Sequence, residues 1–443
     1  MGKNWQNLTA AELGREIGAG RINPVDLAEQ HLEAIGKHPL AERIYARLTP
    51  ARARAEAMAA HGRARKGFRR GLLDGVPISW KDLFDTAGVA TESGSALLKG
   101  RVPERDAEVL EVATQGGLVC LGKTHMSELA FSGLGLNPIT ATPPCINDEG
   151  AVPGGSSSGA AASVAYGLAP AAIGSDTGGS VRIPAAWNDL VGLKTTAGRI
   201  PLGGTVPLCE KFDTIGPIAR TVEDCALLLA AMEGGRPTDL GGASLSGMRF
   251  LVLETVALDD LRERPAQGFE DAVARLGAGG AQIVHGKVPE VAEAMGLAAL
   301  IFTAEAYGIW RDRIEAAPQK MFPRILERFR SGASFSASDY VAGWRRLEVL
   351  RKAWLEKTAG FDAVILPTSP ILPPQADRLM TDDAYYVTEN LLALRNTRIG
   401  NLMGLCGITL PTMQPSCGIS FLGAPHQEER LLRVGAAAAK ALR

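Results

Sequence analysis

The chain has 443 residues, of which 46% are hydrophobic and 21% are charged. This length leaves room for one large domain or two smaller ones, and the composition is typical of a globular protein. The 47 basic and 48 acidic side chains give a formal net charge of −1, so no charge excess points to nucleic acid or to a membrane surface as a partner.

Residues 8–65 are predicted to be helical. Thr9 and Glu12 have the spacing of a capping box, and Asn23 precedes a proline that suits the first helical position. No secretory signal is expected, because the N-terminal stretch has no apolar core.

From residue 71 onward, short apolar runs replace the helical pattern. The segment 74–82 (DGVPISWKD) predicts a short strand that runs into a loop, and 116–124 (GGLVCLGKT) predicts a second strand. The apolar stretch 160–174 is too short to span a membrane and contains Pro170, so it is interpreted as part of a buried helix, with the helix itself expected over 159–169.

The second half predicts a parallel strand–helix–strand unit, from the segments 248–254, 268–276 and 281–286. Residues 290–356 are expected to be helical. The apolar runs 361–367 and 406–411 return to strand before a terminal helix at 428–443.

These elements predict an α/β protein in which helices cover both faces of a mixed central β-sheet. The glycine-rich stretch 234–246 is interpreted as a surface loop, because strands on both sides of it are needed for one sheet. The expected organisation is a single domain over 1–443, in which 1–70 wraps the core, 71–220 carries the chemistry and 235–360 completes the pocket.

Two short motifs suggest chemistry that their surroundings do not support. Residues 117–124 match a phosphate-binding loop, but the variable positions are apolar and favour a buried strand. Residues 155–159 match the nucleophile elbow of α/β-hydrolases around Ser157. No hydrophobic strand precedes them, however, and only His285 and His426 follow as candidate bases.

The sequence also lacks the patterns of metal sites and disulfide frameworks. None of the six cysteines has zinc-site spacing, and there is no HExxH motif, so neither a metal nor a cofactor is expected. This cysteine usage predicts a protein of the reducing cytoplasm.

Two clusters of glycine and hydroxyl residues, 154–159 and 174–180, form the most informative part of the chain. Glycine lets a ligand approach the main chain, and hydroxyls supply nucleophiles and hydrogen-bond partners. The clusters are separated by a small-residue apolar segment, which predicts one site built from two loops.

Several sequence blocks resemble the amidase signature family. They occur in the family's order, at residues 74–88, 122–138, 152–170, 174–187, 191–201 and 361–370. The resemblance covers about two thirds of the chain. It implies amide hydrolysis of a small molecule, no cofactor, and a homodimer.

The resemblance further implies a Ser–cis-Ser–Lys triad, with Ser180 as nucleophile, Ser156 as the bridging serine and Lys81 as base. The backbone N–H groups of residues 177–180 (Thr177, Gly178, Gly179 and Ser180) would form the oxyanion hole. A lysine can act as a base only when it is neutral, which requires burial away from carboxylates. Asp82 and Asp85 are therefore expected to point away from the amine.

Candidate substrate-binding residues come from the same blocks: Arg182, His125, Met126, Gly155 and Trp187. Arg182 would either anchor a substrate carboxylate or support its own loop. Arg395 and Arg398 are further candidates for holding an anionic substrate, against the alternative that they are solvated charges on a helix. At several positions these blocks carry residues that differ from those typical of the family, so the substrate pocket is expected to be unusual.

Two other functions stay open at this stage. One is the glutaminase subunit of a tRNA-dependent amidotransferase, which would work with a second subunit. The other is an inactive member of the family that serves as a binding or scaffold protein.

Overall fold

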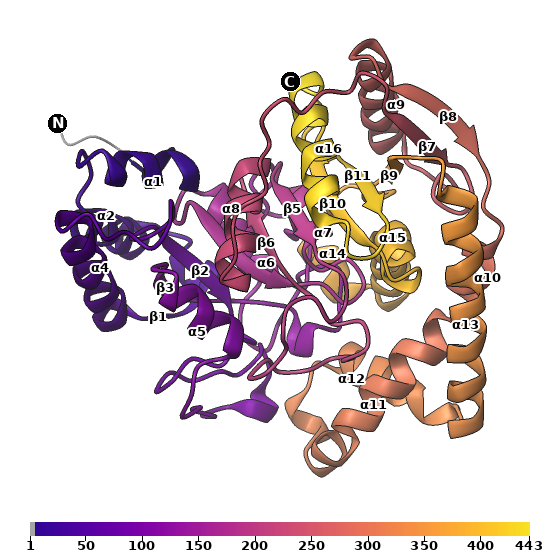
Figure 1. Ribbon diagram of the computed structural model, residues 1–443. Helices are drawn as coiled ribbons and strands as arrows, with labels where there is room; N and C mark the ends of the chain where they lie inside the picture. The colour runs from indigo at the N-terminus through magenta and orange to yellow at the C-terminus, as the bar shows by residue number, and fades with distance from the viewer. Residues whose placement is uncertain (1–4) are drawn as a thin grey trace.

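One mixed sheet of eleven strands runs through the computed structural model, which describes residues 5–443 (Figure 1). In chain order the strands are β1 (Tyr45–Leu48), β2 (Pro77–Lys81), β3 (Val119–Thr124), β4 (Ala171–Ser175), β5 (Val191–Lys194), β6 (Ile215–Ala219), β7 (Arg249–Leu253), β8 (Gln282–Gly286), β9 (Ala363–Pro367), β10 (Cys406–Pro411) and β11 (Gly418–Gly423). Across the sheet they follow the order β1-β3-β2-β4-β6-β5-β10-β11-β9-β7-β8. Strand β2 pairs in parallel with β3 and β4, and β7 pairs in parallel with β8 and β9, whereas the other neighbours are antiparallel.

Helices cover both faces of this sheet. They are α1 (Ala10–Gly18), α2 (Pro24–Lys37), α3 (Ala41–Ile44), α4 (Pro50–Arg65), α5 (Glu108–Gln115), α6 (Ser158–Ala165), α7 (Arg182–Trp187), α8 (Val222–Glu233), α9 (Glu263–Ala278), α10 (Glu290–Gly296), α11 (Ala298–Ala316), α12 (Pro323–Arg330), α13 (Ala337–Thr358), α14 (Ala376–Thr381), α15 (Asp383–Leu402) and α16 (Glu428–Ala441). Nearly every residue of the central strands is buried, whichever face its side chain occupies. Burial on both faces requires cover on both, which confirms the predicted fold class.

The N-terminal helices begin where the sequence predicts. Thr9 and Glu12 form the expected capping box at α1, and Asn23 caps α2 with a proline in the first turn. The short strand β1 between α3 and α4 was not predicted. It pairs antiparallel with β3 at one edge of the sheet.

The expectation of one long helix over 159–169 is wrong in its second half. Helix α6 ends at Ala165, and Gly167 then adopts a φ of 73°, a left-handed conformation that ends helices. Beyond Pro170 the chain becomes strand β4. The apolar stretch therefore contains a helix, a turn and a strand.

The second half of the chain follows the sequence more closely. Strands β7 and β8 are parallel and joined through α9, as predicted, and residues 290–356 are mostly helical. In Figure 1, α10 and α13 lie at the right of the molecule below β7 and β8, and α11 and α12 lie along its lower part. The glycine-rich stretch 234–246 is a loop between α8 and β7.

One stretch of the described residues, Glu290–Ala316, reaches the length and hydropathy of a membrane span. Helix α10 ends within it, and α11, which forms its second part, packs against α12 and α13. Only a third of the window is buried.

The sheet brings the two predicted loop clusters together. Strands β2 and β4 are parallel neighbours, with Trp80 opposite Ile173. Because parallel strands end at the same edge, Lys81 at the end of β2 meets Ser175 at the end of β4.

Candidate active site

Three segments meet at this edge of the sheet. The end of β2 provides Lys81, the loop before α6 provides Ser156, and the end of β4 with the loop after it provides Ser175 and Ser180. All four side chains are buried. The two glycine and hydroxyl clusters thus lie together, as the sequence predicts.

Lys81 is held by two hydroxyl groups. Its Nζ lies 2.7 Å from Ser156 Oγ and 2.8 Å from Ser175 Oγ, and the lysine side chain is fully buried. Ser175 lies in the second predicted cluster, but nothing in the sequence marked it as a contact of Lys81.

The carboxylates next to Lys81 in the sequence point away from its amine, as expected. Asp82 pairs with Arg47 and with Lys123, at 3.1 Å and 3.2 Å. Asp85 pairs with Arg101 at 2.6 Å. Among the described residues, Lys81 therefore has no ion pair.

Burial lowers the pKa of Lys81 from 10.5 to about 7. The ammonium form is penalised because it loses its hydration. Asp213 and Asp176 act in the opposite direction and raise the pKa. The charge of Asp176 is compensated by Arg182, which lies 3.0 Å from it. An amine with a pKa near neutrality can accept a proton at physiological pH.

Ser156 lies on a tightly packed loop, and its peptide bond with Gly155 is cis. The Gly155 N–H donates to Gly133 O, and the Ser127 N–H donates to Ser156 O. A Cβ on Gly155 would lie 2.5 Å from Ser127 Oγ and 2.5 Å from Gly135 N, so only glycine fits there.

Ser180 lies on the neighbouring loop. Its carbonyl accepts a hydrogen bond from the Ser157 N–H at 3.2 Å, which ties the two serine loops together. Its side chain lines a small cavity of about 20 Å³. Within residues 5–443, no hydrogen bond joins the Oγ atoms of Ser156 and Ser180.

The backbone around Ser180 presents amide groups without acceptors. The N–H groups of Thr177, Gly178 and Ser180 donate to nothing within the described residues. Gly179 differs, because its N–H donates to Asp176 Oδ1 at 2.8 Å. Of the four N–H groups predicted for the oxyanion hole, those of Thr177, Gly178 and Ser180 therefore remain candidates. Fixed donors of this kind stabilise the charge that develops on an attacked carbonyl oxygen.

Arg182 does not line the cavity. Its guanidinium makes two hydrogen bonds to Asp176, one to Thr397 O at 2.8 Å and one to Asn401 Oδ1 at 2.6 Å. These contacts fit the loop-supporting alternative and leave few donors for a substrate.

The other predicted substrate-binding residues lie outside the cavity wall. Met126 is fully buried, and its sulfur accepts a hydrogen bond from Ser93. Trp187 is also fully buried and donates its indole N–H to Ile371 O. His125 contacts the first turn of α6 through its carbonyl oxygen. Gly155 shapes the serine loop.

The two arginines predicted on α15 are separated by the structure. Arg398 lines the cavity beside Ser180, whereas Arg395 points toward Ala257 O. A third arginine, Arg328 on α12, also lines the cavity and was not predicted. Arg328 lies on the charged face of an amphipathic helix together with Arg324 and Glu327, so no pattern in the sequence marks this position.

The phosphate-loop and nucleophile-elbow matches have structural roles in the fold. Residues 119–124 form the fully buried strand β3, as favoured over a phosphate-binding loop. Ser157 donates its hydroxyl to Ser175 O. His285 is more than half exposed and lies near Glu254, so it is not a partner for Ser157. Among residues 5–443, no three His, Cys, Asp or Glu side chains gather as metal ligands, and the six cysteines are buried and free.

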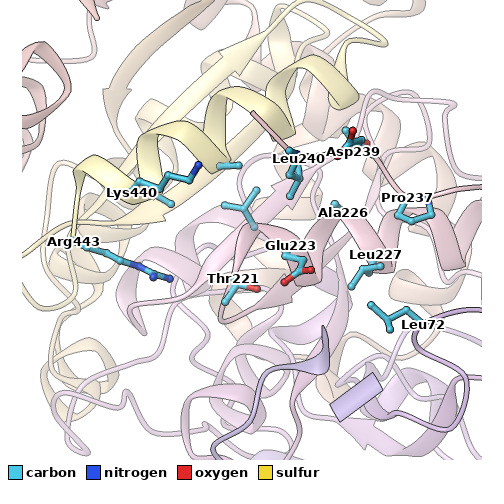
Figure 2. Close-up of a pocket in the computed structure, with 15 residues that line it drawn as sticks. Leu72, Thr221, Glu223, Ala226, Leu227, Pro237, Asp239, Leu240, Lys440 and Arg443 are labelled. Carbon is cyan, nitrogen blue, oxygen red and sulfur yellow. Dashed lines mark hydrogen bonds between the residues drawn. The ribbon is translucent and has the colours of Figure 1, made fainter. Parts of the chain in front are cut away.

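A larger cavity, of about 580 Å³, lies between α8, the loop at 237–241 and α16 (Figure 2). Its polar lining comes from Thr221, Glu223, Thr238, Asp239, Lys440 and Arg443. Glu223 is paired with Arg15 at 2.7 Å. None of the predicted site residues lines this cavity.

Comparison with known proteins gives a consistent family. The amidase family model matches residues 28–432. The chain is 36% identical over 403 residues to 2-amino-5-chloromuconic acid deaminase of Comamonas testosteroni, covering 87% of this chain and 85% of the relative. It is 32% identical over 484 residues to a glutamyl-tRNA(Gln) amidotransferase subunit of Anaeromyxobacter sp. strain K, covering 98% and 96%.

A solved structure is similar over the same length. The native peptide amidase from Stenotrophomonas maltophilia superposes with a TM-score of 0.83 at 26% sequence identity, covering 99% of this chain and 98% of that one. The match extends over the whole sheet and not over a local motif. The chain therefore belongs to the amidase signature family, and it is an enzyme that hydrolyses amide C–N bonds.

Proposed function

We propose that the enzyme hydrolyses a small-molecule carboxamide to an acid and ammonia or an amine, through an acyl-enzyme on Ser180. Ser156 acts as the proton relay and Lys81 as the general base. No metal or cofactor takes part in this proposal.

The reaction proceeds in two halves. Ser180 Oγ forms a bond to the amide carbonyl carbon while its proton passes to Ser156, whose own proton passes to Lys81. The oxyanion is stabilised by the N–H groups of Thr177, Gly178 and Ser180. The C–N bond then breaks, and the nitrogen leaves with a proton returned from Lys81 through Ser156.

Water completes the cycle. It attacks the ester carbonyl and gives up a proton along the same route, and the acid leaves as Ser180 regains its hydrogen. The observation that carries this proposal is the environment of Lys81, which is buried, has no ion pair among the described residues, and lies 2.7 Å from Ser156 Oγ.

Three single substitutions test the proposal with any amide that the wild type hydrolyses. Ser180→Ala should abolish ammonia release, and Lys81→Ala and Ser156→Ala should each lower kcat by orders of magnitude. Circular dichroism confirms that each variant is folded. Wild-type rates in the folded Ser180→Ala variant would refute the assignment.

A second candidate is the glutaminase subunit of a tRNA-dependent amidotransferase. The similarity to a glutamyl-tRNA(Gln) amidotransferase subunit over 98% of the chain favours this candidate. It predicts glutamine-dependent ammonia release and co-purification with a second subunit. If the protein is active alone on simple amides and inactive on glutamine, this candidate is excluded.

The three positions of the proposed triad are filled, so an active-site serine probe should label the folded protein at Ser180. Failure to label would count against the proposed role of Ser180. The proposal also includes a cytoplasmic location and a homodimer. Analytical ultracentrifugation of the purified protein measures the oligomeric state.

A further inference from the structure

Two arginine side chains share the cavity with Ser180. Arg328 comes from α12 and Arg398 from α15, helices that are distant in the sequence from the serine loops. Both side chains are half-buried. They line the same small space as Thr177, Gly178 and Ser180.

Neither arginine has an acidic partner among the described residues. Arg328 donates to Phe131 O at 3.0 Å, and its guanidinium lies 4.4 Å from the centre of the Phe131 ring. Arg398 makes no hydrogen bond within residues 5–443, and its guanidinium lies 5.9 Å from the Phe302 ring. The donors of Arg398 are thus unused.

This arrangement contrasts with the arginine next to the predicted nucleophile. Arg182 is fully buried, but its guanidinium is satisfied by Asp176 and by two oxygen acceptors from α15. Burying a cation without such partners is costly, and two cations in one cavity also repel each other. Consistently, burial and the neighbouring Arg328 lower the pKa of Arg398 to about 9.

The cavity lining contains no aspartate and no glutamate. Its other polar side chains are the hydroxyls of Ser132, Thr177 and Ser180. A substrate carboxylate would find two guanidinium groups, which bind such anions through paired hydrogen bonds. A substrate ammonium would find no opposite charge and two like charges.

We infer that this cavity selects amides that carry a carboxylate and no ammonium group, of the class of monoamides of short dicarboxylic acids, with Arg398 and Arg328 holding the carboxylate. The inference rests on the proposed function, because it places the scissile carbonyl at Ser180. The cavity is small, about 20 Å³, so among such amides the shortest require the least displacement of its walls.

Binding of the corresponding diacids tests the inference without any reaction. Malonate, succinate and glutarate are titrated separately into the wild-type enzyme by isothermal calorimetry. At least one should bind. Arg398→Met should weaken that binding at least tenfold, because a charge-assisted hydrogen bond to a desolvated anion is lost.

Arg395→Met provides the matched control. Arg395 is half-buried on the same helix, but it points toward Ala257 O and does not line the cavity. Its variant should bind the diacid within about twofold of the wild type. Arg398→Lys keeps a positive charge and should bind more tightly than Arg398→Met, which separates loss of charge from misfolding.

Turnover provides a second readout. Glutaramate and glutamine differ only by the α-amino group, and succinamate and succinamide differ by the carboxylate. Glutaramate should have a kcat/KM at least tenfold higher than glutamine, and succinamate one at least tenfold higher than succinamide. Arg398→Met should reduce both preferences.

Three results would overturn the inference: no diacid binds, Arg398→Met binds it as well as the wild type, or Arg395→Met weakens it equally. Faster turnover of glutamine or succinamide would do the same. Arg398-dependent diacid binding in an enzyme whose Ser180→Ala variant stays active would refute the proposed catalytic role and leave the binding inference standing.

Discussion

The pH dependence of the reaction tests the role of Lys81 most directly. Burial places the pKa of this lysine at about 7, against 10.5 for the free side chain. At about 1.4 kcal/mol per pKa unit, the fold therefore favours the neutral amine by about 5 kcal/mol. Because the base must be neutral, kcat/KM should rise with pH through the pKa and then level off.

The expected profile follows from this value. Well below the inflection, kcat/KM should rise about tenfold per pH unit, and at pH 6 it should be roughly a tenth of its limit. Initial rates of ammonia release between about pH 5 and pH 9 measure it, with circular dichroism at each pH to exclude unfolding. A flat profile, an inflection near 10, or a rate that falls through pH 7 would refute the role of Lys81 as base.

Lys123 provides a matched control for this profile. It is buried on β3, next to the strand that carries Lys81, but it pairs with Asp82 at 3.2 Å and donates to Thr91 Oγ1. Lys123→Met should therefore leave the inflection in place. If Lys123→Met moves or removes the inflection of kcat/KM, the profile reports the titration of Lys123 and not that of Lys81.

Three further substitutions probe the surroundings. Gly179→Ala should lower kcat by about a hundredfold with an unchanged dichroism spectrum, because a Cβ would lie 2.0 Å from Thr397 Oγ1 and displace the loop. Arg182→Met leaves the buried Asp176 carboxylate without its ion-pair partner and should lower the free energy of unfolding by about 3–5 kcal/mol. Denaturant unfolding measures this loss, and a value below about 1 kcal/mol would contradict the expectation. Thr9→Ala removes the cap of α1 and should cost about 1 kcal/mol while activity is retained.

The fold was predictable where local signals are strong. The caps of α1 and α2 and the strand–helix–strand unit around α9 follow directly from residue patterns. Strands β4 and β6 were missed because they are short and contain glycine or proline, which lower strand propensity. Their pairing in the middle of the sheet stabilises them despite that composition.

The site was predictable only in part. The glycine and hydroxyl clusters indicated two loops of one site, but Lys81 was linked to them by family resemblance and not by any pattern. Arg328 was missed because other charged residues surround it on an amphipathic helix. What distinguishes it is the cavity it reaches, and that cavity forms only when α12 and α15 pack near the serine loops.

Three buried lysines show why only one of them suits base catalysis. Lys194 donates to the carbonyls of Thr195 and Leu405, which can only accept hydrogen bonds, and Lys123 faces the Asp82 carboxylate. The carbonyls around Lys194 leave the lone pair of a neutral amine without a donor, and the Asp82 carboxylate stabilises the charged form of Lys123.

Lys81 instead lies beside the hydroxyls of Ser156 and Ser175, which can donate as well as accept. Its neutral form can therefore accept a hydrogen bond from Ser156, along the direction in which the proposed proton transfer runs. In the ammonium form Lys81 donates a charge-assisted hydrogen bond to the same Ser156 Oγ, and this bond is the stronger of the two. Ser156→Ala removes it and should lower the pH inflection of any residual activity, and an inflection that moves upward would contradict the argument.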